Sequence, residues 1–310
     1  NNFEIYLKRV WFSNGIHHHY SNAKFTANFS SEYLSGLLAQ TNTKLEGEAF
    51  DVIFNDNDAK KVNLSKDVDN VLLSAVNLYG PDITTADVES FYSDKVSPNK
   101  DKPLSFGLNS QLVKINGELT ERVYKSGGLY GAAIDEITKW LELAQGVAEN
   151  TAQGEALGLL IEYYKTGDLQ VWDDYNVAWT AATEGNIDYI NSFIEVYNDP
   201  VGYTGSYETI VQVKDFDMSQ KMAVLSENAQ WFEDNSPLMD AHKKKNVVGV
   251  SYKVVNVAGE AGDASPSTPI GVNLPNANWI RAAVGSKSVS LGNIIHSYNN
   301  AGSSGRLKEY

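Results

Sequence analysis

The stretch "FIEVYNDPVGYTGSYE", residues 193–208, sets two strand patterns on either side of a turn. Glu195 and Tyr197 alternate with apolar neighbours, so on a strand they would share one face. An Asp-Pro pair and two glycines then favour a turn, and "YETIVQVKDF", residues 207–216, alternates again with β-branched residues. The stretch therefore predicts two strands, although an exposed Glu–Tyr pair before a turn would give the same pattern.

Other strand signals lie on both sides of this stretch. "QLVKINGELTERVYK", residues 111–125, has two alternating runs around Asn116-Gly117, which is a strong hairpin signal. "NVVGVSYKVVNVAG", residues 246–259, is β-branched and alternates, whereas the small polar residues 259–269 predict a loop. Strands are expected near 112–125, 193–197, 207–216 and 246–258.

Helical periodicity appears between the strand signals. Four segments place apolar residues three or four positions apart, namely 84–95, 129–144, 156–163 and 218–232. Gly167 is placed to end the third of these helices. "GSKSVSLGNII", residues 285–295, predicts a capped entry into another helix. With no internal repeat, the chain is expected to be an α+β protein.

Composition narrows the classes of partner. The chain has 310 residues and a net charge of −14, which argues against nucleic acid and anionic membranes as partners. No run reaches 18 apolar residues, and no signal peptide is visible at the N-terminus. Cysteine is absent, which excludes disulfides, zinc–thiolate sites and thiol catalysis.

Three consecutive histidines, His17, His18 and His19, are candidates for a metal site. Zinc needs ligands that converge, but adjacent residues on a strand point to opposite faces, so at most two of the three could share one. His242 and His296 stand alone, and no histidine begins an H-E-x-x-H motif. Polar residues at a strand end, or residues that line a cleft and bind a ligand, are the alternatives to a metal site.

A third unusual stretch is "PIGVNLPNANWIR", residues 269–281. Its prolines and glycine favour an extended backbone that displays Asn273 and Asn276. Each asparagine offers a donor and an acceptor, which suits recognition of a peptide backbone. An ordinary Pro-Asn turn would also explain the pattern.

Together these stretches resemble the dipeptidyl peptidase III family, zinc exopeptidases that remove dipeptides from the N-terminus of short peptides. "FIEVYNDPVG" with "GSYE", and "PIGVNLPN" with "SKSVSLGNII", are similar to family segments in order and spacing. "RVWFSNGIHHHYSNAKF", residues 9–25, resembles the early cleft segment of the bacterial form. The resemblance runs from about residue 6 to the last residue.

The resemblance implies roles for particular residues. Glu195 would bind the peptide ammonium group, and Tyr197 would be catalytic, its hydroxyl reaching the scissile carbonyl and the oxyanion. Asn273 and Asn276 would hold the dipeptide backbone. The same resemblance implies a substrate subsite wall and cleft lining made by Pro269, Ile270, Tyr20 and His18. The histidines are thus expected to line the cleft rather than to bind metal.

The departure from the family concerns the metal site. The family motif His-Glu-x-x-Gly-His is absent, and "SSGRLKEY" at residues 303–310 resembles the segment before the zinc helix. We therefore expect the substrate-binding part of a larger enzyme, a fragment made by truncation or proteolysis, inactive alone, with zinc in the intact enzyme and none in this chain. A noncatalytic peptide-binding relative is the alternative.

The expected partners are short peptides with a free N-terminus and the zinc lobe, which is absent from this chain. Neither nucleic acid nor membrane is expected. The resemblance implies a cytoplasmic protein, and a periplasmic or secreted location stays open because the native N-terminus is expected to be missing.

The implied fold has two lobes. Residues 1–215 would form the lower, substrate-binding lobe, which holds a five-stranded β-barrel with surrounding helices. Residues 216–256 would cross into the helical upper lobe, and residues 257–310 would return to the lower lobe and lead toward the zinc lobe. The helix expected at 218–232 would then have an uncovered apolar face.

Overall fold

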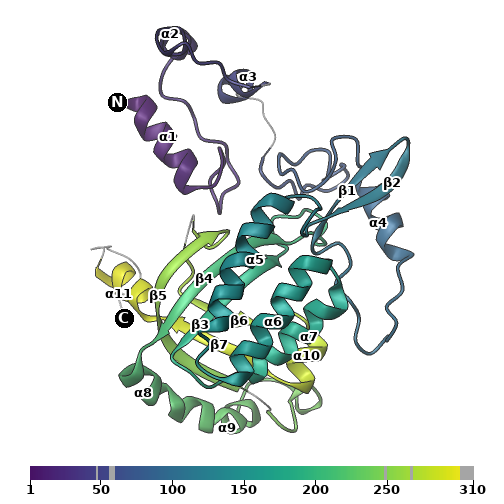
Figure 1. The fold of residues 1–310 in the computed structure, drawn as a ribbon, viewed down its shortest axis with the longest axis vertical. Helices are drawn as coiled ribbons and strands as arrows, with labels where there is room; N and C mark the ends of the chain where they lie inside the picture. The colour runs from purple at the N-terminus through teal and green to yellow at the C-terminus, as the bar shows by residue number, and fades with distance from the viewer. Residues whose placement is uncertain (47, 56–59, 248–249, 266–267, 301–310) are drawn as a thin grey trace.

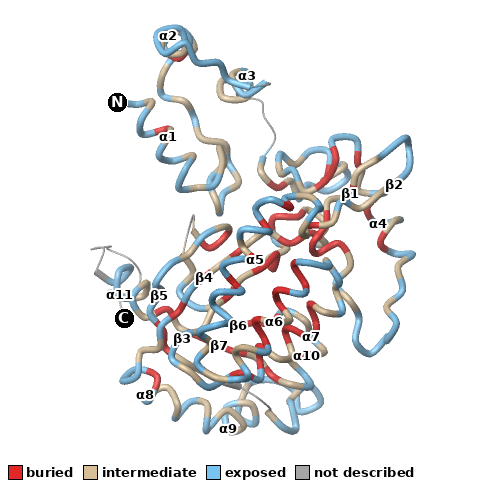
Figure 2. Tube along the Cα trace, viewed as in Figure 1, coloured by how far each residue is buried: buried red, intermediate tan, exposed pale blue. Residues whose placement is uncertain are grey.

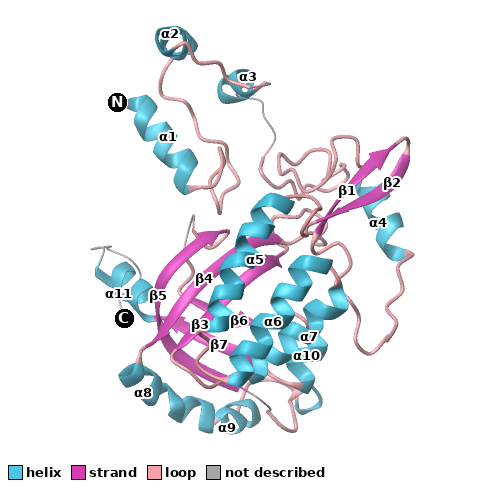
Figure 3. Ribbon diagram, viewed as in Figure 1, coloured by secondary structure: helices cyan, strands magenta, loops and turns pink. Residues whose placement is uncertain are grey.

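A computed structural model describes residues 1–46, 48–55, 60–247, 250–265 and 268–300 (Figure 1). Helices and strands alternate along the chain (Figure 3), which confirms the expected α+β class. The helices are α1 (Asn2–Phe12), α2 (Ser31–Thr41), α3 (Ala49–Phe54), α4 (Thr85–Ser93), α5 (Gly131–Gly146), α6 (Thr151–Thr166), α7 (Leu169–Ala181), α8 (Phe216–Glu227), α9 (Ala229–Asp234), a 3-10 turn (Asp240–His242), α10 (Asn278–Ala283) and α11 (Gly292–Asn300). The strands are β1 (Ser110–Ile115), β2 (Glu118–Val123), β3 (Ile187–Glu195), β4 (Ser206–Lys214), β5 (Val250–Gly262), β6 (Gly271–Leu274) and β7 (Ser286–Leu291).

The main sheet has five strands in the order β3-β4-β5-β7-β6. β3, β4 and β5 pair antiparallel, β5 and β7 pair parallel, and β6 pairs antiparallel with β7. The second sheet is the β1–β2 hairpin, whose Asn116-Gly117 turn has positive φ at both residues, as the sequence predicts.

The main sheet is curved but open, so the expectation of a β-barrel is wrong. A barrel needs a backbone ladder between its first and last strands, and in the described chain β3 and β6 are both edges. On β3 the Tyr189 carbonyl accepts from Trp179 Nε1 of α7 at 3.0 Å, and the Ile187 carbonyl accepts from Gln153 Nε2 of α6 at 2.8 Å. Helix side chains thus occupy edge acceptors that a closing strand would need.

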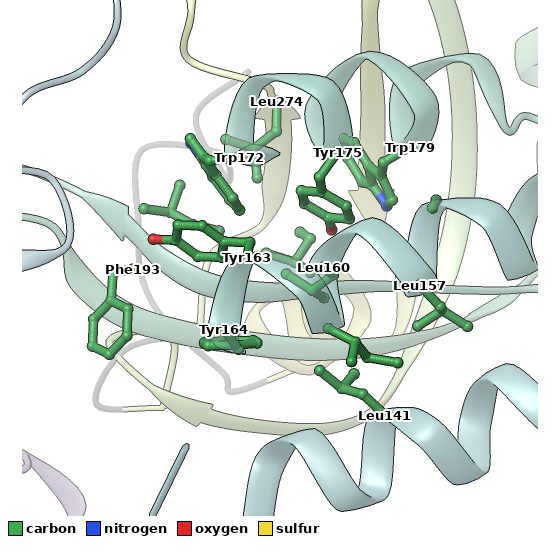
Figure 4. Packing of buried hydrophobic residues seen from close by; sticks show 14 of the residues in the cluster. Leu141, Leu157, Leu160, Tyr163, Tyr164, Trp172, Tyr175, Trp179, Phe193 and Leu274 are labelled. Atoms are coloured by element: carbon green, nitrogen blue, oxygen red, sulfur yellow. The ribbon is translucent and has the colours of Figure 1, made fainter. Parts of the chain in front are cut away.

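The main core lies between α5–α7 and this sheet (Figure 2). Aromatic side chains dominate it, among them Tyr163, Tyr164, Trp172, Tyr175 and Phe193 (Figure 4). Helices α6 and α7 follow one another and pack closely, because the turn between them is only two residues long. The core therefore fixes the position of β3, whose last residue is Glu195.

Two stretches differ from the sequence-based expectation. β5 continues through residues 259–262, which were expected to be loop, because these residues pair with β4 as far as Gly262 and Glu208. Residues 286–291 form β7, not a helix entry, because they pair with β5 and β6; the helix α11 starts only after them.

The helix expected over 218–232 is split into α8 and α9 at Asn228. α8 packs on β5 through Ser219, whose hydroxyl donates to the Val254 carbonyl at 2.9 Å. Large apolar side chains on the two helices are exposed, including Val224, Trp231 and Phe232. Within the described residues, no helix combines the length and the apolar character needed to cross a membrane.

The N-terminal helices α1–α3 lie beyond one end of the sheet in Figure 1. A turn-rich segment joins α1 to α2, and His17 pairs with Lys24 in an isolated antiparallel bridge. Asn14 Nδ2 donates to the Gly262 carbonyl at 2.6 Å. This segment therefore reaches the end of β5, where the acidic pocket described below is found.

Candidate functional site

The end of β3 separates two pockets. Glu195 and Tyr197 line one of them, whereas Ile194 and Val196 line the other. This alternation is the one the sequence predicts, because successive strand residues face opposite sides. A register shift between Phe193 and Glu195 marks the point where β3 leaves its pairing with β4.

The turn after Tyr197 is fixed by a buried carboxylate. Asp199 accepts hydrogen bonds from the backbone N–H groups of Val201, Tyr203 and Thr204 at 2.7–2.9 Å. It also accepts from the Tyr79 hydroxyl at 2.5 Å. Asp199 thus has a structural role and holds the start of β4 opposite the end of β3.

The pocket on the Glu195 side, which we call the acidic pocket, has a volume of about 460 Å³. Its walls come from the end of β3, β4, the turn after β5, β6 and the N-terminal segment. The lining residues include Glu195, Tyr197, Asn198, Glu208, Asp263, Asn273, Pro269, His19 and Tyr20. Segments far apart in sequence therefore meet here, and three carboxyl groups face one space.

Five of the residues singled out from the sequence line this pocket directly, namely Glu195, Tyr197, Asn273, Pro269 and Tyr20. Asn276 lines the second pocket, but its Nδ2 donates to Glu195 Oε1 at 3.5 Å, so it lies beside the carboxylate. Residues near 195 and near 275 thus converge, although about 80 positions separate them.

Ile270 and His18 lie outside the described lining of the acidic pocket. Ile270 is 60% exposed, and its carbonyl accepts from the Leu291 N–H at 3.0 Å, which prolongs the β6–β7 pairing. His18 Nδ1 accepts from the backbone N–H groups of Tyr20 and Ser21 at 3.3 and 3.2 Å. His18 therefore shapes the turn, and its neighbour His19 reaches the pocket.

Glu208 has the most unfavourable environment in the acidic pocket. It is 6% exposed, and no hydrogen-bond donor of the described chain reaches its carboxylate. Burial, followed by the negative charges of Glu195, Asp263 and Glu260, raises the pKa of Glu208 to about 7. Burial also raises the pKa of Glu195, while the hydrogen bond from Asn276 opposes that rise.

Asp263 connects the walls of the pocket. Its carboxylate accepts hydrogen bonds from the Tyr197 hydroxyl and, at 2.9 Å, from Asn198 Nδ2. Asn198 Nδ2 also donates to Ser206 Oγ at 3.0 Å. Burial raises the pKa of Tyr197, and the bond to Asp263 adds to the rise. The hydroxyl therefore stays protonated at neutral pH.

Positively charged side chains lie near the pocket, but in the part of the chain that the structure describes none of them forms an ion pair with its carboxyl groups. Burial lowers the pKa of His19, and the Asp263 charge opposes this fall. His19 Nδ1 is buried without a hydrogen-bond partner in the described chain. Burial likewise lowers the pKa of Lys61, again opposed by Asp263. Because no cationic side chain of the described residues pairs with the three carboxyl groups, the pocket favours a cationic ligand.

Glu208 and Asp263 were not singled out from the sequence as site residues, whereas His19 is one of the three histidines expected to line the cleft. Glu208 carries a signal, because Ser206, Glu208, Ile210 and Gln212 share the inward face of β4 and an acid among them is unusual. Asp263 has no such signal in the sequence, because it lies in the small polar stretch, residues 259–269, that predicts a loop.

No group of three or more histidine or acidic side chains in the described residues could hold a metal ion. The residues present thus do not fit the zinc site that the resemblance implies for an intact enzyme. Within the described residues, His17–His19 are not part of any such group.

The second pocket lies on the helix side of β3 and has a volume of about 340 Å³. It is mainly aromatic and aliphatic, with Trp172, Tyr175, Trp179, Tyr203, Ile194 and Leu274 among its lining residues. Leu274 lines both pockets, so the end of β6 is a wall that they share.

Comparison with known proteins gives consistent matches. A family model, Peptidase family M49, matches residues 106–308, more than half of the chain. Dipeptidyl peptidase 3 of Nematostella vectensis is 27% identical over 172 residues, which cover 56% of this chain and 23% of the relative. Dipeptidyl peptidase 3 of Homo sapiens is 29% identical over 168 residues, which cover 54% and 22%.

The fold has a counterpart among solved structures. DPP III from Caldithrix abyssi superposes with a TM-score of 0.64 at 20% identity. The match covers 96% of this chain and 56% of that chain. The chain thus spans little more than half of that structure, and the aligned stretches span less than a quarter of the two curated relatives.

Proposed function

Because the chain belongs to peptidase family M49, we propose that its acidic pocket binds the free N-terminus of short peptides. The chain would then be the substrate-binding part of a zinc metallo-dipeptidyl peptidase. The observation that carries this proposal is a pocket of about 460 Å³ with three carboxyl groups, one of which lacks any donor from the described chain.

An ammonium group is the ligand that this charge pattern favours. A carboxylate–ammonium hydrogen bond is stronger than a neutral one, and a buried carboxyl without a partner gains most from a cationic donor. Glu195 would be the main partner, because it lies at the rim shared with Asn276. Glu208 lies deeper, at 6% exposure.

The peptide backbone would be held by the asparagines. Asn273 lines the pocket and Asn276 lies against Glu195, so their amides can reach the first peptide units. Pro269 and Tyr20 would form the walls around the dipeptide. We assign no ligand contact to Ile270 or His18.

Tyr197 would lie beside the scissile bond in the intact enzyme. A role as donor to the carbonyl requires its hydroxyl to leave Asp263, to which it donates here. The proposal also assigns residues 1–215 and 257–310 to the substrate-binding lobe and residues 216–256 to a crossing toward the zinc lobe. The exposed apolar residues of α8 and α9 support that assignment.

A noncatalytic peptide-binding protein of the same family is the second candidate. It would use the same pocket for peptide binding without chemistry of its own. The two candidates make the same prediction for peptide binding by this chain and differ in whether the gene continues into a zinc motif.

Calorimetric titration of the 310-residue chain with tetra-alanine and with N-acetyl-tetra-alanine tests the proposal. We expect the free amine to bind and the acetylated peptide to bind about tenfold or more weakly, because acetylation removes the charge. Glu195→Gln should weaken only the free peptide. Glu227→Gln, on the exposed end of α8, is the control for net charge. Equal affinity for both peptides would sink the proposal.

A further inference from the structure

Asp263 is held in place by its backbone as well as by its side chain. Its N–H donates to the Tyr207 carbonyl at 2.8 Å, directly after the last pair of the β4–β5 ladder. The preceding Gly262 has φ of +69°, and a Cβ there would lie 2.2 Å from the Tyr207 oxygen. The turn therefore depends on glycine, and it directs the Asp263 carboxylate into the acidic pocket.

Both oxygens of this carboxylate are used within the chain. Oδ1 accepts from Asn198 Nδ2 at 2.9 Å, and Oδ2 accepts from the Tyr197 hydroxyl. A tyrosine hydroxyl has one proton to donate and lone pairs that accept. Since the proton is directed at Asp263, the oxygen of Tyr197 has only lone pairs to offer to the pocket.

The groups that face Tyr197 across the pocket are acceptors as well. The charges of Glu208 and Glu195 act on its hydroxyl, and the ring of His19 lies edge-on with centroids 6.1 Å apart. A ligand among these oxygens must bring N–H or O–H donors. An ammonium group carries three such donors, and Glu195, Glu208 and Tyr197 together offer acceptors for them.

We propose that Asp263 is a positioning residue that sets the hydrogen-bond polarity of Tyr197, so that Tyr197 accepts a hydrogen bond from an ammonium or amide N–H of the peptide. This inference rests on the proposed function. It differs from the donor role toward a carbonyl that the family resemblance implies for Tyr197. It also gives a role in ligand recognition to Asp263, a residue in a stretch whose sequence predicts only a loop.

A double-mutant cycle on the 310-residue chain tests the inference. Tetra-alanine is titrated into the wild type, Tyr197→Phe, Asp263→Asn and the double variant, with Glu227→Gln as the charge control. We expect each single substitution to weaken binding about tenfold, since each removes or misdirects the acceptor for a charged donor. The double variant should bind no more weakly than Tyr197→Phe, because Asp263 acts through that hydroxyl.

Two results would overturn the inference. Unchanged or tighter binding by Asp263→Asn would mean that Tyr197 is a donor held back by Asp263. Losses that multiply in the double variant would mean that Asp263 contacts the peptide itself. Asp263→Glu keeps a carboxylate that can accept from the Tyr197 hydroxyl. It should therefore recover part of the affinity that Asp263→Asn loses.

A ligand-free arm separates this inference from the proposed function. A wild-type chain that binds no peptide sinks the proposed function, and thermal unfolding of the same four proteins then tests only the contact by which Asp263 orients the Tyr197 hydroxyl. If the double variant lowers Tm no more than either single variant does, the result supports the Asp263–Tyr197 contact. Additive losses of Tm would overturn it.

Discussion

Glu208 is a carboxyl group whose charged form is disfavoured by the fold. Its folded-state pKa of about 7 lies above the ordinary value of 4.5, so the folded chain holds a proton that the unfolded chain releases. Stability therefore falls as pH rises from about 4.5 and levels off above about 7. The full effect is on the order of 3 kcal/mol.

Glu208→Gln should remove much of this pH dependence. We expect the wild type to lose stability between pH 5 and pH 8, and the variant to lose markedly less, because an amide does not ionise. Urea unfolding at both pH values measures the difference. The Glu227→Gln control should keep the wild-type slope, since Glu227 is exposed on α8. Parallel wild-type and Glu208→Gln curves would contradict the assigned environment.

At the scale of residues, the sequence predicts those site groups that are carried by local patterns. Strand alternation puts Glu195 and Tyr197 on one face, and prolines flank the extended segment that holds Asn273, but only the family resemblance assigns these residues to a site. Asp263 could not be found, because its role depends on Tyr197 and Asn198, 65 or more positions away. Long-range side-chain contacts of this kind leave no periodic signal.

At the scale of elements, Gly167 shows how a single position ends a helix. It is the residue after α6 and has φ of +73°, a left-handed conformation that glycine adopts without strain. A Cβ on this residue would lie 2.6 Å from Val123 Cγ1 of β2. Gly167 thus both ends α6 and permits its close approach to the hairpin.

Gly167→Ala should destabilise the chain by about 1–3 kcal/mol, because the strained backbone and the contact with Val123 act together. Gly146→Ala is the matched control. Gly146 is the last residue of α5, and a Cβ there meets nothing within 4 Å, so its substitution should be neutral or slightly stabilising. Urea unfolding compares both variants with the wild type. An equal loss of stability in both variants would argue against Gly167 as the residue that ends α6.

Elements with local signals were predicted, and those made by distant pairing were not. The Asn116-Gly117 hairpin and the end of α6 at Gly167 agree with the sequence. β7 was missed because its serines resemble helix caps and because its buried Lys287 has its ionic partner, Asp188, 99 positions away. The last residues of β5 read as loop, yet β4 supplies their partners.

At the scale of the whole molecule, side chains link β3 to the β6–β7 side of the sheet, where a barrel would have backbone pairs. Lys287 Nζ lies 2.8 Å from Asp188 Oδ2, and Asn276 Nδ2 lies 3.5 Å from Glu195 Oε1. Both contacts link β3 to the β6–β7 side. The open edge leaves room for the second pocket between β3, α7 and the segment after β6.

The same architecture leads to the last prediction, which concerns activity. The acidic pocket supplies charge and hydrogen-bond acceptors, but the described residues contain no cluster that could hold a metal, and the sequence contains no His-Glu-x-x-Gly-His motif. Activating water for attack on an amide requires such a metal or an equivalent base beside the bond. We therefore expect the 310-residue chain to bind peptides without hydrolysing dipeptidyl arylamides, with or without added zinc. Release of the arylamine would be followed by absorbance, with an intact family enzyme as the positive control. Hydrolysis that persists through repurification and is abolished by a chelator would show that this chain builds a metal centre by itself.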